Sequence, residues 1–200
     1  MDMMQIIKGR RSVRAYQPRA VPEEHLVQIL EAARWAPSPH GRQPWRFVVI
    51  TRPEVRQRLA AAMGATWRQQ LALDRQDEAV INLRLEKSHQ RILNAPGLII
   101  PCLYLEDLDC YPDPERQSAE MIMAIQSLGC AAQNMLLMAY SLGLDGGWMC
   151  APLFCPETVR AALDLEQTLT PHALITIGYA ARDPLRRERR PLEELVVQWQ

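Results

Sequence analysis

The strongest constraint on the fold of this chain is its most apolar stretch, which runs from about Gln117 to Leu142. Polar side chains interrupt this stretch at short intervals, which is not the pattern of a membrane span; they are Glu120, Gln126, Ser127, Gln133 and Asn134. A helix that is apolar on most sides has to be buried in a large core or in a subunit interface. Gly143 follows, and glycine is typical of the position after a helix end.

Helical patterns occur on both sides of this stretch. Residues 22–36 form an amphipathic pattern in which Pro22 suits the first turn of a helix. Residues 51–54 (TRPE) resemble a capping box that opens a helix to about Met63. Residues 66–94 are polar and helix-prone, and two interpretations remain open for them: a segment that covers the substrate, or a surface helical hairpin. A short helix is expected from residue 156 to 163.

Three short apolar segments have the composition of buried strands, namely residues 46–51, 97–105 and 172–179. Pro101 lies inside the second of them and suggests an edge position or a bulge, because proline cannot donate a hydrogen bond to a strand ladder. Trp148 begins another extended segment. The alternation of strands and helices predicts an α/β or α+β fold, and 200 residues suit a single domain over residues 1–200.

Composition narrows the class of protein. The chain is 48% hydrophobic and 23% charged, which is normal for a globular protein, and its net charge of zero gives no indication of nucleic-acid or membrane partners. The five cysteines form no Cys-x-x-Cys pair, so we expect reduced thiols in the cytoplasm. The four histidines have no zinc-ligand spacing, so no metal site is expected. The first residues lack the basic start and apolar run of a signal peptide.

Arginines cluster near both ends of the chain. A phosphate monoester carries nearly two charges and several acceptor oxygens, and it therefore needs several convergent donors. The two clusters would form a phosphate site if the fold brought them together, whereas the alternative is two solvated charged segments. The first cluster is Arg10, Arg11 and Arg14 beside Ser12, and the second is Arg186, Arg187, Arg189 and Arg190.

Residues 36–45 (APSPHGRQPW) form a polar segment that its three prolines make rigid. Ser38, His40 and Gln43 offer a hydroxyl, an imidazole and an amide, and Arg42 adds a guanidinium. Such groups suit the carbonyls and ring nitrogens of a flavin. The alternative is a stiffened turn in which Trp45 fills the core.

Residues 143–152 (GLDGGWMCAP) form a third candidate segment. Glycines allow a planar ligand to approach the backbone closely, and free N–H groups there can bond the ring nitrogen that accepts hydride. The segment lacks the Gly-Lys-Ser/Thr ending of a mononucleotide loop and the Gly-x-Gly-x-x-Gly of a dinucleotide fold. Cys150 is expected to be a packed thiol rather than a nucleophile.

The three segments resemble, in the same order, motifs of the FMN-dependent nitroreductase superfamily. Residues 10–14 (RRSVR) resemble its phosphate-binding start, and residues 36–45 resemble its Ser-x-x-Asn-x-Gln-Pro-Trp motif, with Gly41 where many members have asparagine. Within the superfamily, residues 37–45 and 148–156 (WMCAPLFCP) are most similar to the C-terminal FMN domain of the bifunctional gamma-glutamyl ligase of coenzyme F-420 biosynthesis. The ligase half has no counterpart in this sequence, so the resemblance does not imply glutamate addition.

The resemblance implies an α+β fold with a nitroreductase-like central mixed sheet flanked by helices. It also implies an intertwined homodimer with two FMN sites, each built from both chains. The expected cofactor-binding residues are Arg10, Arg11, Ser12, Arg14, Ser38, His40, Gln43, Gly147, Trp148, Met149, Arg187 and Arg189, and the roles of Arg187 and Arg189 could be exchanged with Arg186 and Arg190.

The implied activity is an FMN-dependent oxidoreductase that passes hydride from NAD(P)H through the flavin to a small organic acceptor. The acceptor would be a nitroaromatic, a quinone or the dehydro precursor of coenzyme F-420, and no catalytic side chain is required because the flavin carries the chemistry. Two alternatives remain open. One is a flavin-dependent dehydrogenase or oxidase on the same fold, and the other is a flavin- or deazaflavin-binding module without turnover.

Overall fold

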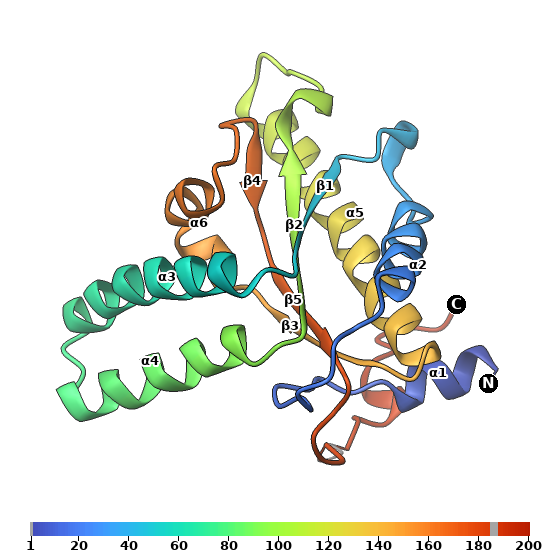
Figure 1. Cartoon of the computed structure of the whole chain (residues 1–200). Coiled ribbons are helices and arrows are strands. Elements are labelled where there is room, and N and C mark those ends of the chain that lie inside the picture. Colours follow the sequence, from blue (N-terminus) through green and yellow to red (C-terminus); the bar gives the residue numbers. More distant parts are fainter. Residues whose placement is uncertain (1, 185–187) are drawn as a thin grey trace.

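A computed structural model describes residues 2–184 and 188–200 of the chain, and a five-stranded sheet lies at its centre (Figure 1). The strand order is β1 (Trp45–Ile50), β2 (Gly97–Tyr104), β5 (Leu174–Gly178) and β3 (Asp145–Met149), and β4 (Leu169–Pro171) also pairs with β2. Every pairing between these strands is antiparallel. The one parallel pairing within the described residues is an isolated bridge between Ser12 and Gly146. The predicted α+β class is confirmed, and the expected mixed character of the sheet is limited to this bridge.

Pro101 lies in the central strand β2, which corrects the expectation of an edge position. On one side Pro101 faces Phe47 of β1. On the other side the partner of β2 changes from β5 to β4, and His172 in the gap donates its backbone N–H to the Pro101 carbonyl at 3.0 Å. The N–H and C=O of one strand residue point to the same side, so the missing donor of Pro101 falls at this interruption of the ladder.

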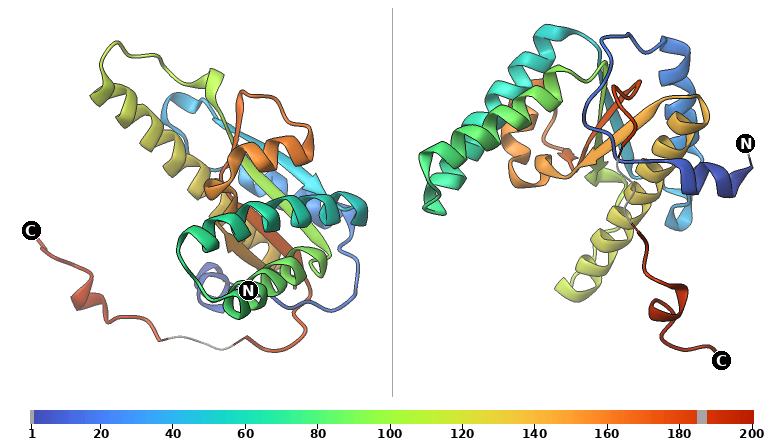
Figure 2. Two further views of the ribbon diagram at one scale, coloured as in Figure 1. Left: turned by 90° about the vertical axis from the view of Figure 1, so that its left-hand side faces the viewer. Right: turned by 90° about the horizontal axis from the view of Figure 1, so that it is seen from below.

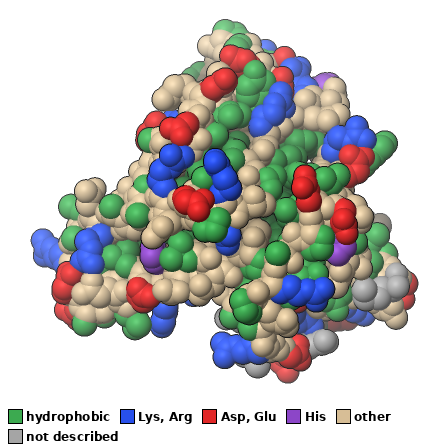
Figure 3. All heavy atoms as spheres, viewed as in Figure 1, with side chains coloured by type: hydrophobic (Ala, Val, Ile, Leu, Met, Phe, Trp, Pro, Cys, Tyr) green, Lys and Arg blue, Asp and Glu red, His purple; other side chains and the backbone are tan. Residues whose placement is uncertain are grey.

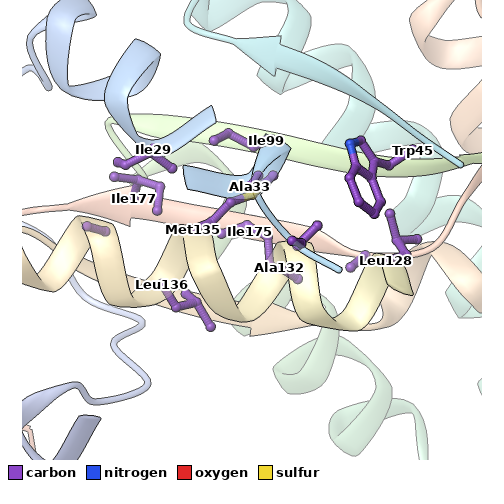
Figure 4. Close-up of a cluster of buried hydrophobic side chains, with 14 of the residues drawn as sticks. Ile29, Ala33, Trp45, Ile99, Leu128, Ala132, Met135, Leu136, Ile175 and Ile177 are labelled. Carbon is purple, nitrogen blue, oxygen red and sulfur yellow. The ribbon is translucent and has the colours of Figure 1, made fainter. Parts of the chain in front are cut away.

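Helices cover both faces of the sheet. The apolar stretch forms α5 (Pro114–Ser141), which packs with α2 (Glu23–Arg34) on one face. Figure 4 shows this layer, in which Ile29 and Ala33 of α2 meet Met135 of α5 over Ile99 and Ile175 of the sheet. These side chains are fully buried, and the predicted role of the apolar helix in the core is confirmed.

Helix α5 is long and apolar enough to cross a membrane by length and composition alone. Its second half is buried in the core, as the complete burial of Ala131, Met135 and Ala139 shows. Its first half projects beyond the sheet, and Ile122 and Ile125 there are exposed (Figure 2). The helix is therefore the core element that its composition predicts, with one end left uncovered.

The other face of the sheet is covered by α3 (Pro53–Leu73), α4 (Glu78–Leu93) and α6 (Pro156–Leu163), which enclose a second apolar cluster. Helices α3 and α4 form a helical hairpin, and α4 also lines a cavity, so both interpretations of residues 66–94 stay open. The predicted capping box at residues 51–54 is wrong. Pro53 takes the first helical position, so Arg52 and not Thr51 is the N-cap, and it makes no side-chain cap bond.

Two elements near the ends of the chain complete the fold. Helix α1 (Met3–Gly9) begins with a capping box formed by Asp2 and Gln5, which the sequence analysis did not predict. Strand β3 begins at Asp145, three residues earlier than expected, because Gly146 and Gly147 pair with β5.

Residues 10–16, called the arginine segment below, lie along β3. The Val13 N–H donates to the Gly146 carbonyl at 3.0 Å, and the Tyr16 hydroxyl donates to the Val13 carbonyl at 2.9 Å. The same hydroxyl lies 2.6 Å from Thr176 Oγ1 of β5. Gly147 makes this approach possible, because a Cβ atom there would lie 2.4 Å from the Val13 carbonyl oxygen.

We predict that Gly147→Ala lowers the free energy of unfolding by about 1–3 kcal/mol. The new methyl group would clash with the Val13 carbonyl and would lie 2.7 Å from Thr176 Oγ1. The matched control is Gly64→Ala inside α3, where a Cβ atom meets nothing within 4 Å. It should raise the free energy of unfolding by roughly 0.8–1 kcal/mol through helix propensity. Urea unfolding followed by circular dichroism measures both, and a Gly147→Ala variant as stable as the wild type would contradict the close packing.

Candidate functional site

A cavity of about 1560 Å³ is lined by the arginine segment, the C-terminal half of α4 and the chain after β5. Among the described residues that line it, nine are arginine or lysine and two, Glu86 and Asp183, are acidic. Figure 3 shows Lys and Arg side chains (blue) on both sides of the notch between α4 and the part of the molecule that carries the arginine segment. A hollow with this excess of positive charge attracts anions.

Three cations that line this cavity, Arg10, Arg11 and Arg189, act on one another electrostatically. Burial lowers the pKa of Arg10, and the positive charges of Arg189 and Arg11 lower it further. The Nε atoms of Arg10 and Arg11 are buried and have no acceptor among the described residues. Within this part of the chain, none of the three forms a salt bridge with a carboxylate. Buried donors and like charges held together in this way are stabilised by a bound anion.

The extended conformation of the arginine segment decides which side chains face the cavity. Val13 and Tyr16 are buried against the sheet, whereas Ser12 and Arg14 are exposed and line the cavity. Successive side chains of an extended chain point to opposite sides, so the buried Val13 turns its two neighbours outward. Arg11 also lines the cavity, and its guanidinium donates to the Lys8 carbonyl at 2.6 Å.

The C-terminal arginine cluster meets the first cluster at one described position. Arg189 lines the cavity, while Arg190 lies outside it and faces Glu194 at 3.9 Å. The predicted contacts of Arg187, and the alternative contacts of Arg186, lie outside the described residues. The structure therefore brings the two ends of the chain together, with Arg189 as the described contributor.

Ser38, His40 and Gln43 lie at the other end of β1, away from the arginine segment of the same chain (Figure 1). His40 lies within a short 3₁₀ turn, residues 39–41, and Ser38 and Gln43 flank it. The Gln43 N–H donates to Ser38 Oγ across the turn at 3.0 Å. Arg42 fixes this turn by donating to the Asp107 carbonyl at 3.0 Å and by pairing with Asp109. That carboxylate also raises the pKa of Arg42.

The backbone of this turn is strained. His40 and Gln43 have φ angles of 55° and 53°, in the left-handed region that residues with side chains rarely adopt. Such residues cost about 1–3 kcal/mol each and occur preferentially at functional sites, where the surroundings hold them in place. The polar side chains of this turn are thus presented in a fixed arrangement, at a distance from the basic cavity of their own chain.

Gly147, Trp148 and Met149 lie in β3. The side chains of Trp148 and Met149 point to opposite faces of the sheet. Trp148 packs against the cluster under α5, and Met149 packs against the cluster under α3. The Nε1 atom of Trp148 is buried without an acceptor among the described residues. The close approach that Gly147 permits is to the arginine segment of the same chain.

The sequence analysis missed several cations of the cavity. Arg56 donates to the Thr51 carbonyl at 2.9 Å, and Arg19 lies over the Tyr179 ring with its guanidinium carbon 3.8 Å from the ring centroid. Lys87 and Arg91 of α4 lie four residues apart, at the spacing that places side chains on one helix face. The spacing of these two cations, just before a predicted buried strand, was the sequence pattern that could have indicated their place in the cavity. Within residues 2–184 and 188–200, no group of three or more His, Cys, Asp or Glu side chains is placed to hold a metal ion.

Comparison with known proteins places this chain in a family. The model of the nitroreductase family matches residues 7–179. A protein of Thermus thermophilus named NADH dehydrogenase is 33% identical over 195 residues, which cover 94% of this chain and 91% of that protein. A protein of Methanothermobacter thermautotrophicus, which carries a name for NADH dehydrogenase or NAD(P)H nitroreductase activity, is 30% identical over 192 residues, covering 94% of this chain and 82% of that protein.

A similar solved structure comes from Desulfovibrio desulfuricans, whose protein was crystallised in complex with FMN. It has a TM-score of 0.77 and 29% identity, and the match covers 100% of this chain and 98% of that one. The family match spans most of the sequence, and the resemblance stated from the motifs is confirmed at this level. The chain belongs to the nitroreductase family, a family of oxidoreductases that work with FMN.

Proposed function

We propose, from its membership of the nitroreductase family, that this protein uses FMN to transfer electrons from NAD(P)H to a small organic acceptor. The observation that carries the proposal is the group of Arg10, Arg11 and Arg189. Their positive charges converge, and the buried Nε donors of Arg10 and Arg11 lack acceptors within the described chain. A phosphate monoester supplies both the negative charge and the acceptor oxygens that this group needs.

The residues of the cavity fit FMN. Arg10, Arg11 and Arg189 would hold the phosphate, Arg187 is a further candidate outside the described residues, and Ser12 and Arg14 would bind the phosphate or the ribityl chain. Ligand cavities usually measure about 300–1,000 Å³. The cavity here is larger, at about 1560 Å³, which leaves room for a second molecule beside the cofactor.

The flavin ring would lie beside Gly147, Trp148 and Met149. The Trp148 Nε1–H group there is a buried donor without an acceptor among the described residues. When bound, FMN accepts hydride from the reductant and delivers electrons to the acceptor. The chain itself contributes binding, orientation and positive charge. This division of work requires no catalytic side chain.

The acceptor is proposed from chemistry and motif together. A nitroaromatic or a quinone suits a site in which the flavin carries the chemistry. The dehydro precursor of coenzyme F-420 is the more specific candidate, which residues 148–156 support through their resemblance to the FMN domain of the F-420 ligase. The free state of all five cysteines supports a place in the reducing cytoplasm.

The first test is the visible absorbance of the purified protein, before and after anaerobic addition of NADH and then of NADPH. We expect oxidised flavin bands that bleach with at least one donor. Bands that persist with both donors would favour a binding module without turnover. Oxygen-dependent turnover of an organic substrate without either donor would favour a dehydrogenase or oxidase. Failure to bind FMN after incubation with it would overturn the proposal.

Single substitutions test the phosphate site. Arg10→Ala or Arg14→Ala should weaken FMN binding by roughly 1.5–3 kcal/mol, the scale of one hydrogen bond to a charged group. Fluorescence titration of the apoprotein with FMN measures this change. Arg34→Ala on α2 is the matched control, because Arg34 is exposed, pairs with Glu31 and lies outside the cavity. Full flavin retention in both cavity variants would show that the phosphate assignment is wrong.

We further propose a homodimer in which each FMN site takes residues from both chains. Ser38, His40 and Gln43 lie far from the arginine segment of their own chain, so a second copy is needed to bring them to the cofactor. Exposed apolar side chains supply a surface for this association. They occur on α1 (Met3, Met4 and Ile7), on the projecting half of α5 (Ile122 and Ile125) and on the C-terminal segment that extends from the body in Figure 2 (Leu192, Leu195, Val197 and Trp199).

Complementation tests the shared site. Arg10→Ala/Arg14→Ala chains and Gln43→Ala chains should each bind FMN weakly, and co-expression should yield mixed dimers in which one of the two sites is intact. We expect tight binding of about one equivalent of FMN per purified mixed dimer, which is half an equivalent per chain, measured by absorbance after separation with two affinity tags. A sedimentation coefficient of a monomer, or no recovery of binding in the mixed dimer, would contradict a site shared between chains.

A further inference from the structure

The charge of the cavity exceeds what one cofactor can neutralise. Nine arginine or lysine side chains line it against two carboxylates. Several of these cations have partners, but the partners are neutral, such as the backbone carbonyls that bind Arg56 and the Tyr179 ring beneath Arg19. A phosphate monoester carries about −1.5 to −2 charges. If FMN binds as proposed above, a substantial positive charge remains in the cavity.

Two of the positive charges that remain in the cavity lie on α4. Lys87 and Arg91 lie one helical turn apart and line the wall that faces the arginine segment. Neither side chain forms a salt bridge with the described residues. The nearby carboxylate of this wall, Glu86, accepts a hydrogen bond from the Gln90 amide at 2.9 Å. Like charges at this spacing destabilise a helix, and a bound anion reverses that effect.

We propose that Lys87 and Arg91 form a second anion subsite, which binds a phosphate or other anionic group of the substrate while the arginine segment holds the FMN phosphate. This inference rests on the proposed function. Two substrates could carry such a group: the reductant, if it is NADPH with its 2′-phosphate, or an acceptor with a phosphate, sulfonate or carboxylate of its own. The subsite therefore selects among reductants or acceptors by charge.

The position of the pair suits a substrate that comes and goes. Lys87 is exposed and Arg91 is half-buried, so both are accessible at the mouth of the cavity, whereas the buried Nε atoms of Arg10 and Arg11 suit a cofactor that stays. Exposed cations also steer an anionic substrate towards the cavity, and this effect decreases as the ionic strength rises.

The test is a calorimetric titration of the FMN-loaded protein with adenosine 2′,5′-bisphosphate and, separately, with 5′-AMP. The first probe carries the 2′-phosphate of NADPH and the second does not. If the reductant occupies the subsite, the bisphosphate should bind about tenfold more tightly, and Lys87→Ala/Arg91→Ala should remove most of this difference. The ratio of kcat/KM for NADPH to that for NADH should fall by about the same factor.

A second arm measures turnover with NADH and either anthraquinone-2-sulfonate or a neutral quinone of similar size. If the acceptor occupies the subsite, the sulfonate should have the higher kcat/KM, and the double variant should lose that preference. Arg84→Ala is the control in both arms, because Arg84 lies on the same helix, is exposed and does not line the cavity. Equal effects of Arg84→Ala and the double variant would show a general charge effect and overturn the proposal.

The two proposals fail in different ways. If neither the bisphosphate nor the sulfonate is preferred by the wild type, or if either preference survives in Lys87→Ala/Arg91→Ala, the second subsite is wrong while flavin reduction by NADH still supports the proposed function. If nucleotide binding depends on Lys87 and Arg91 but the flavin bands do not bleach, the subsite is supported and the proposed turnover is wrong. The titration needs no turnover, so it remains informative in that case.

Discussion

The site depends on the packing of the arginine segment against β3. Strand β3 lies at one end of the strand order, and the bridge between Ser12 and Gly146 adds a short parallel partner to its free edge. An unprotected edge strand can pair with another molecule, so this contact also closes the sheet on that side. Gly147 permits the approach, because a Cβ atom there would clash with the Val13 carbonyl, and Gly146 leaves room for Leu136 of α5, which a Cβ atom would meet at 2.6 Å. The same backbone contacts that complete the sheet aim the arginines at the cavity.

This packing has an electrostatic cost in the free protein. The segment holds Arg10 and Arg11 near Arg189, and the like charges together with burial lower the pKa of Arg10. Protons on these guanidinium groups are retained at any physiological pH, so the repulsion cannot be relieved by deprotonation. It is relieved by binding of an anion, and a ligand that binds only the folded protein stabilises it by mass action. Under the proposed function, cofactor affinity and folding stability are therefore coupled through the same side chains.

Sequence patterns predicted the elements that composition controls and missed those that depend on distant contacts. The apolar stretch, the three strands and the amphipathic helix before them were found because hydrophobic periodicity reports burial directly. Pro101 was misplaced because its tolerance comes from a change of partner strand that no local pattern encodes. The capping box failed by one residue, since Pro53 fixes the helix start and leaves Thr51 outside it.

The candidate site shows the same division. The arginine clusters and the rigid turn were identified from local chemistry, but only the fold places Arg189 beside Arg10 and leaves the turn at the opposite end of β1. The left-handed conformations of His40 and Gln43 were not predictable, because the turn is held by bonds from Arg42 to Asp107 and Asp109, which lie more than sixty residues away in the sequence. The cations of α4 were missed because a surface helix normally carries charges at such positions.

The separation of the rigid turn from the basic cavity limits what one chain can do alone. The cavity can hold an anion, because the donors for it are already in place around Arg10. The polar side chains suited to a flavin ring lie elsewhere, on a turn with a strained backbone that is separate from the cavity of its own chain. Strain of this kind persists only where surrounding structure holds it, and here Arg42 does so through two bonds to the loop after β2. A second chain that docks on the exposed apolar side chains of α1 and α5 would let both halves of the site act on one cofactor.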